Sequence, residues 1–306
     1  MKLINQSAQY LPQQAGIDGI YKQIELAGRT SYLSWDKMTD DSAKKFVDML
    51  IKSRHFSVLE HGAVYLKIPV YTNTYEIFKH YSWNAYSKIA KVEDYSAFSY
   101  ITTNLRVLQE NGWLDDLKYL CEPNEFHEKR LSVKVVTSRG ISHELVRHRG
   151  MSFIQESQRY CNYSNGKHGD EITCIIPSWF PENTTEISLK KMIEDIEFLY
   201  KIEDDELRTK MSWFTSAMMN ANLCYDEMIN SGCTAQQARD VLPNATKTTL
   251  VITAFESDWR EWFAQRLFGK TGEPHPDMLV LANLIKEEFE KAGVWERIIK
   301  YPSKYD

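Results

Sequence analysis

Residues 147–160 read RHRGMSFIQESQRY, from Arg147 to Tyr160. This stretch places three guanidinium groups, one imidazole, two glutamine amides and two serine hydroxyls close together in the chain. Arginine carries a planar fork of donors that binds phosphate or imide oxygens through paired hydrogen bonds. In a chain with a net charge of −5, this cluster indicates a pocket for an anionic ligand. The alternative, a solvated helix end with structural arginines, is the usual explanation of an isolated Arg-His-Arg.

The sequence on both sides of this stretch predicts an α+β protein. The predicted strands cover residues 63–69, 131–137 and 247–253, and the longer predicted helices cover 41–53, 256–268 and 277–292. No βαβ alternation is visible, so we expect a central, mostly antiparallel sheet flanked by helices. The aromatic-rich segment between the first two strands is expected to join two strands of one sheet.

Two further helices are predicted from their capping residues. Ser142 can cap a short helix over 143–149, which Gly150 would end. Thr234 and Gln237 form a possible capping box for a helix that Pro243 stops.

Composition limits the class of protein. The chain has 306 residues, 43% hydrophobic and 26% charged, which is ordinary for a globular protein. A net charge of −5 argues against a protein that coats nucleic acid. No signal peptide and no run of 18 apolar residues is present, so no membrane span is expected. The five cysteines include no C-x-x-C, which predicts a reduced, cytoplasmic protein without a disulfide framework.

No metal site is predicted. The stretch from His143 to His148 has its two histidines five positions apart, one more than the H-E-x-x-H zinc motif requires. Side chains five apart do not share one face of a helix as those four apart do.

The signature segment resembles that of the flavin-dependent thymidylate synthases. In that family R-H-R is followed by seven residues and a serine, as Arg149 is followed by Ser157 here. Shorter elements that also resemble the family occur in the same order along the chain, at 29–32, 55–61, 138–145, 238–243, 259–266 and 275–276. The resemblance covers roughly residues 18–67 and 131–298. It implies one catalytic domain over 1–306 with the thymidylate synthase-complementing protein fold and an insertion at about 68–130.

The resemblance implies FAD as the cofactor, held without a dinucleotide-binding glycine fingerprint. Six residues are the expected FAD contacts by position: Ser57, Arg147, His148, Arg149, Gln155 and Glu261. Glu261 stands where relatives often have Asn or His. Positive charge near a flavin stabilises its reduced, anionic form.

The substrate implied by the resemblance is dUMP. Its expected contacts are Glu144, Leu145, Val146, Arg147, Gln155, Glu156, Ser157, Gln158, Arg159, Arg239 and Arg266. Arg266 and Ser157 are the expected catalytic residues. Arg266 would favour loss of the N3 proton, because a fixed cation lowers the pKa of an adjacent acid. Ser157 would position the substrate.

The implied reaction methylates dUMP to dTMP, with 5,10-methylenetetrahydrofolate as carbon donor and NADPH as the source of flavin electrons. Relatives form homotetramers with shared active sites, so self-association is expected here. A second hypothesis keeps the flavin pocket for hydroxymethylation, or for another pyrimidine nucleotide. A third, an arginine-rich nucleic-acid-binding module, is disfavoured by the negative net charge.

Overall fold

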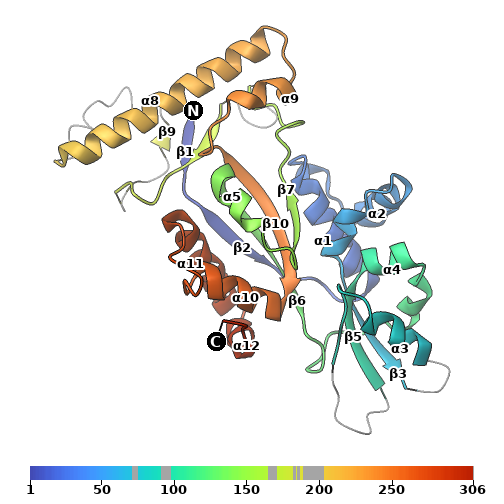
Figure 1. Ribbon diagram of the computed structural model, residues 1–306. Coiled ribbons are helices and arrows are strands. Elements are labelled where there is room, and N and C mark those ends of the chain that lie inside the picture. Colours follow the sequence, from blue (N-terminus) through green and yellow to red (C-terminus); the bar gives the residue numbers. More distant parts are fainter. Residues whose placement is uncertain are drawn as a thin grey trace.

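The computed structural model describes residues 1–70, 75–90, 98–164, 171–181, 184, 187–188 and 203–305. Its centre is an antiparallel sheet in the order β2-β6-β10-β7 (Figure 1). The strands are β2 (Ser7–Leu11), β6 (Arg130–Ser138), β10 (Lys247–Phe255) and β7 (Ser152–Gln155). β6 and β10 pair along their whole length, because runs of Val, Ile, Leu and Thr favour extended backbone that is buried on both faces. The predicted α+β class with a central antiparallel sheet is confirmed.

Helices cover one face of this sheet. They are α10 (Glu256–Arg266), α11 (Pro276–Lys291) and α12 (Trp295–Lys300). Trp259, Trp262 and Phe263 of α10 are 0% exposed. Trp259 and Phe263 pack edge-on against Phe289 of α11, and Trp262 packs edge-on against Trp259. The predicted helices over 256–268 and 277–292 are therefore confirmed, with ends within two residues of the prediction.

A second sheet, in the order β3-β5-β4, lies on the opposite side of the molecule from α10, α11 and α12 (Figure 1). Its strands are β3 (Ala63–Pro69), β5 (Phe98–Asn104) and β4 (Lys88–Ile89). It packs with α1 (Gly16–Thr30), α2 (Ser42–Lys52), η2 (Phe56–His61), α3 (Tyr75–Ser82), α4 (Leu105–Asn111) and η3 (Leu114–Tyr119). The predicted helix over 41–53 is confirmed as α2.

The prediction that 63–69 and 131–137 belong to one sheet is wrong. β3 pairs with β5, which the intervening segment itself supplies, from Ala63↔Asn104 to Pro69↔Phe98. β6 is already bonded on both edges, to β2 and β10. The backbone groups of the two strands are therefore satisfied in separate sheets.

The third sheet contains β1 (Lys2–Ile4), β8 (Thr173–Ile175) and β9 (Ile187–Ser188), in the order β8-β1-β9. The long helix α8 (Asp205–Asn230) covers it and is followed by α9 (Ala235–Ala238) and η4 (Arg239–Val241). The Gln237 side chain accepts the Thr234 backbone N–H at 2.9 Å, as expected of a capping box. The helical turns end before Pro243. The short η1 (Trp35–Lys37) follows α1.

The short helix before the signature segment begins earlier than predicted. α5 covers Arg139–Leu145, and Ser138 caps it by accepting the Ile141 N–H at 3.2 Å. Ser142 lies inside the helix and donates to the Arg139 carbonyl. The predicted span 143–149 was wrong because Ser138 and Ser142 are both cap-forming residue types, and only the Ser138 hydroxyl reaches the free amides of the first turn.

None of the helices in the described ranges is long and apolar enough to cross a membrane. The described residues also contain no group of His, Cys, Asp and Glu side chains suited to a metal ion.

Candidate active site

A cavity of about 500 Å³ lies where the loop after α5 meets α10 and the C-terminal residues. The loop supplies Arg147, His148 and Arg149, and α10 supplies Glu261 and Arg266. These five residues come from two predicted regions more than 100 positions apart, and folding brings them into one cavity. The structure therefore brings Arg147, His148 and Arg149 of the segment 147–160 into one cavity with Arg266.

Arg266 makes three side-chain hydrogen bonds at this cavity. Its Nη1 donates to Glu144 Oε2 at 2.9 Å, and its Nη2 reaches the Glu144 carbonyl at 3.3 Å. Its Nε donates to His148 Nε2 at 3.0 Å. The side chain is only 19% exposed, so these bonds hold the guanidinium in one orientation.

His148 is neutral near pH 7. Burial is the main cause that lowers its pKa to about 4, and the nearby cations Arg266 and Lys304 lower it further. A neutral imidazole can accept the Arg266 Nε–H, whereas an imidazolium cannot. His148 thus orients Arg266 without adding a positive charge.

Six further residues line this cavity and were not predicted, among them Asp258, Lys304 and Tyr305. Burial raises the pKa of Asp258, and Gly150 packs on that carboxylate, so a Cβ there would lie 3.3 Å from Asp258 Oδ1. The backbone N–H of Lys304 donates to Glu261 Oε1 at 2.7 Å, and its Nζ lies 3.9 Å from Glu261 Oε2. Tyr305 completes the C-terminal wall. Their positions depend on how the chain end folds back, which no local pattern indicates.

The other predicted substrate residues lie elsewhere in the chain. Ser157 donates its backbone N–H to the Ser31 carbonyl at 3.0 Å, and Arg159 Nε donates to Gln236 Oε1 at 2.9 Å. Arg239 is 41% exposed beside Asp240. Ser157, Gln158, Arg159 and Arg239 do not line the 500 Å³ cavity.

Three predicted contacts have side chains directed into the protein. Leu145 is 0% exposed. The Glu156 carboxylate is 0% exposed and accepts bonds from Tyr163, Lys247 and the Thr249 backbone N–H. Gln155 donates to Ser142 at 2.9 Å and to Thr248 at 3.0 Å. These side chains hold β7 and its flanking turn in place.

Val146 is 44% exposed, and Ser57 is exposed on η2. Neither lines the 500 Å³ cavity. Within one chain, the predicted residues therefore form one cationic cavity and a separate group around Ser157, Arg159 and Arg239.

Comparison with known proteins identifies the family. Residues 89–292 match the family described as thymidylate synthase complementing protein. The chain belongs to this family. The match includes every predicted site residue except Ser57, and it begins inside the expected insertion at about 68–130.

Two relatives of this chain are named flavin-dependent thymidylate synthase. The one from Mycolicibacterium gilvum is 27% identical over 81% of this chain and 68% of its own. The one from Mycolicibacterium vanbaalenii is 24% identical, over 84% and 71% respectively.

Two solved structures are similar at 15% identity. One is the UMP/dUMP methylase PolB from Streptomyces cacaoi, with a TM-score of 0.46, covering 97% of this chain and 96% of that one. The other is Thymidylate Synthase X from Helicobacter pylori with FAD and dUMP, with a TM-score of 0.38, covering 97% and 100%. At these TM-scores the two structures say nothing about the site of this chain.

The donor set of the cavity suits the pyrophosphate of a flavin dinucleotide. Arg147 and Arg149 are exposed, and no side-chain ion pair of either is found within the described ranges. Their guanidinium forks are therefore available to phosphate oxygens. The acidic lining residues are Asp258, whose pKa is raised by burial, and Glu261, whose carboxylate lies 3.9 Å from Lys304 Nζ.

Proposed function

We propose that this member of the thymidylate synthase complementing protein family is a flavin-dependent thymidylate synthase. The reaction is the reductive methylation of dUMP to dTMP, with 5,10-methylenetetrahydrofolate as carbon donor and NADPH as reductant of FAD. The observation that supports it best is the convergence of Arg147, Arg149 and Arg266 on one cavity. The relatives named flavin-dependent thymidylate synthase support the same reading.

Bound FAD would supply the hydride, and the chain would bind and orient the reactants. Arg147 and Arg149 would hold the dinucleotide, together with Ser57, His148, Gln155 and Glu261 as the remaining proposed contacts. Glu144 and neutral His148 fix the Arg266 guanidinium. A cation fixed in this way favours the N3-deprotonated uracil, which is more electron-rich at C5.

The second group, Ser157, Arg159 and Arg239, would bind dUMP, with Glu144, Leu145, Val146, Gln155, Glu156 and Gln158 around it. In a single chain this group does not line the cavity that contains Arg266. We therefore propose a homotetramer in which each site combines the cavity of one protomer with this group from another. The five cysteines are all free, which supports the proposed cytoplasmic location.

Anaerobic turnover tests this function. The purified protein, reconstituted with FAD, should convert dUMP to dTMP when supplied with NADPH and the folate donor. Arg266→Ala should reduce kcat by on the order of 100-fold or more, because it removes the oriented cation. Wild-type turnover that survives this substitution would remove Arg266 from the mechanism.

Product mass separates the alternatives. A gain of one methyl group on dUMP supports methylation, whereas a hydroxymethyl product supports the second hypothesis. Protein that binds neither FAD nor dUMP would contradict both.

A further inference from the structure

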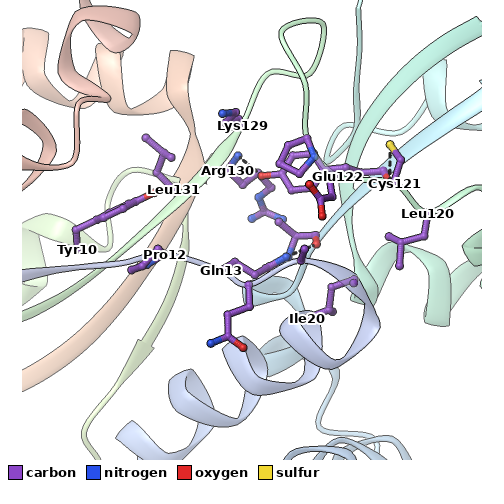
Figure 2. A pocket seen from close by; sticks show the side chains of 16 residues that line it. Tyr10, Pro12, Gln13, Ile20, Leu120, Cys121, Glu122, Lys129, Arg130 and Leu131 are labelled. Carbon is purple, nitrogen blue, oxygen red and sulfur yellow. Dashed lines mark hydrogen bonds between the residues drawn. The ribbon is translucent and has the colours of Figure 1, made fainter.

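A second cavity, of about 300 Å³, lies between the central sheet and the β3-β5-β4 sheet (Figure 2). Its walls come from the chain before and at the start of α1, the start of β3, the segment Leu120–Pro123 and the start of β6. It shares no lining residue with the 500 Å³ cavity that contains Arg147, Arg149 and Arg266, called the arginine cavity below. We propose that it binds a small carboxylate- or phosphate-bearing ligand with an apolar body.

Arg130 provides the main evidence. It is 7% exposed, and Figure 2 shows its side chain directed toward the middle of the lining residues. Its Nη2 donates to Ser152 Oγ at 2.9 Å, but Nε and Nη1 have no partner among the described residues. A buried guanidinium with two unpaired nitrogens is costly, so a compensating negative group is expected nearby.

The acidic residues nearest to Arg130 make no hydrogen bond with it in the described part of the chain. Glu60 is bound by Arg106, and the structure shows no ion pair between Arg130 and either Glu60 or Asp258 in the described ranges. Burial raises the pKa of Asp258, and the charges of Glu60 and Asp258 stabilise the Arg130 cation only through space. The guanidinium of Arg130 lies 5.2 Å from the centre of the Phe255 ring and keeps two N–H groups without a hydrogen-bond partner among the described residues. In a poorly solvated region its positive charge favours an anion in the adjoining cavity.

Other donors face the same cavity. Lys129 is half-buried, burial and the nearby Arg297 lower its pKa, and no partner of its Nζ is found within the described ranges. The Tyr65 hydroxyl accepts the Arg130 backbone N–H at 3.1 Å. Burial raises the pKa of Tyr65 to about 12, so this hydroxyl keeps a proton that it can donate.

The start of α1 adds backbone donors. Its N-cap residue, Ala15, provides no side-chain hydrogen bond, so the amides of the first turn lack that acceptor. Ala15 and Gly16 both line the cavity. The positive end of a 15-residue helix thus points to the same space as Arg130 and Lys129.

The remaining lining decides the shape of the ligand. Apolar side chains from Tyr10, Pro12, Ile20, Leu120 and Leu131 surround the donors, and one carboxylate, Glu122, is exposed to solvent. A volume of about 300 Å³ is at the small end of the range for ligand sites. These features fit a short aromatic or aliphatic body that carries one oxyanion.

Binding of benzoate and of phenyl phosphate to the full chain tests this proposal. Both are titrated by calorimetry into protein with FAD and dUMP present in excess, with benzamide as the uncharged analogue. We expect saturable binding of at least one anion and none of benzamide. Binding of benzoate alone identifies a carboxylate site, and binding of phenyl phosphate alone identifies a phosphate site.

Lys129→Gln removes one cation from this cavity and none from the arginine cavity. It should weaken anion binding on the order of tenfold, as expected for one charge-assisted hydrogen bond. Lys52→Gln, the same chemical change at an exposed lysine outside the cavity, should leave binding unchanged. Arg130→Lys, if it folds, should also weaken binding.

Cys121 reports the location of the ligand. This thiol lines the cavity, whereas Cys224 is exposed elsewhere. The anion should slow alkylation of Cys121 by iodoacetamide and leave Cys224 unaffected, as measured by mass spectrometry. Absence of anion binding to the folded protein, equal binding of benzamide, or binding that Lys129→Gln does not weaken would overturn the proposal. Each readout is independent of turnover, so failure of the proposed synthase function would not affect it.

Discussion

At the scale of single residues, the hydrogen bond from Arg266 to His148 depends on the protonation state of the imidazole. Its pKa is lowered to about 4, below the ordinary value near 6.5. Between these two values the folded protein keeps His148 neutral while the unfolded chain is protonated. Protons therefore favour unfolding, and the stability that His148 contributes is lost as the pH falls through this window.

His148→Gln should flatten that part of the pH profile. Glutamine can still accept the Arg266 Nε–H but does not titrate. The free energy of unfolding, measured by denaturant titration from pH 7 to pH 4, should fall less steeply than in the wild type. His55→Gln, at an exposed histidine outside the cavity, is the matched control. Equal slopes in wild type and His148→Gln would show that this imidazole does not titrate as described.

The buried hydrogen bonds of Glu156 are expected to stabilise the fold. Its buried carboxylate bonds Lys247 Nζ at 2.6 Å, the Thr249 N–H at 3.0 Å and the Tyr163 hydroxyl at 2.9 Å. Glu156→Gln should cost about 3 kcal/mol of unfolding free energy, because it leaves the ammonium of Lys247 without its counter-charge. Glu125→Gln, at an exposed glutamate, should cost almost nothing. A variant of Glu156 that is as stable as the wild type but has lost dUMP affinity would instead make Glu156 a direct substrate contact.

At the scale of elements, local patterns predicted what neighbouring residues determine. The β-branched run of β10 and the apolar spacing of α2, α10 and α11 predicted these elements well. Strand pairing could not be predicted in the same way, because the hydrogen bonds between β3 and β5 join residues that are far apart in the sequence. The helix cap was also ambiguous, since Ser138 and Ser142 differ only in which hydroxyl reaches a free amide.

The cap of α5 can be tested directly. Ser138→Ala should cost about 1 kcal/mol and speed hydrogen exchange at the Ile141 amide, which loses its acceptor. Ser142→Ala should leave exchange at that amide unchanged, because the Ser142 hydroxyl bonds Arg139 and Gln155 instead. Faster exchange in Ser142→Ala alone would restore the helix start expected from sequence.

At the scale of the whole molecule, local sequence patterns could not predict which distant residues meet in one cavity. Arg147 and Arg149 are neighbours in the chain, so their common cavity follows from one loop. Lys304 and Asp258 join them only through tertiary closure, and no short-range pattern could indicate that. Ser157, Arg159 and Arg239 lie outside this cavity in a single chain, which makes assembly the remaining step toward a complete site.

Mixed oligomers test that step. Arg266→Ala removes the cation of the cavity, and Arg239→Ala removes one from the separate group. If each site combines the two groups from different protomers, an equal mixture of the two inactive variants recovers about one quarter of wild-type activity. In random assembly, half of the cavities and half of the partnering groups are intact, and both must be intact at one site.

The matched control mixes Arg266→Ala with Arg147→Ala. Both substitutions lie in the same cavity of one chain, so every cavity in this mixture carries a defect and activity should not return. The two chains of each mixture are refolded together and carry different tags, so that mixed oligomers can be isolated before turnover is measured. Isolated mixed oligomers of Arg266→Ala and Arg239→Ala that stay inactive would place the whole site within one protomer, and the chain would then have to close Arg239 onto the cavity by a conformational change.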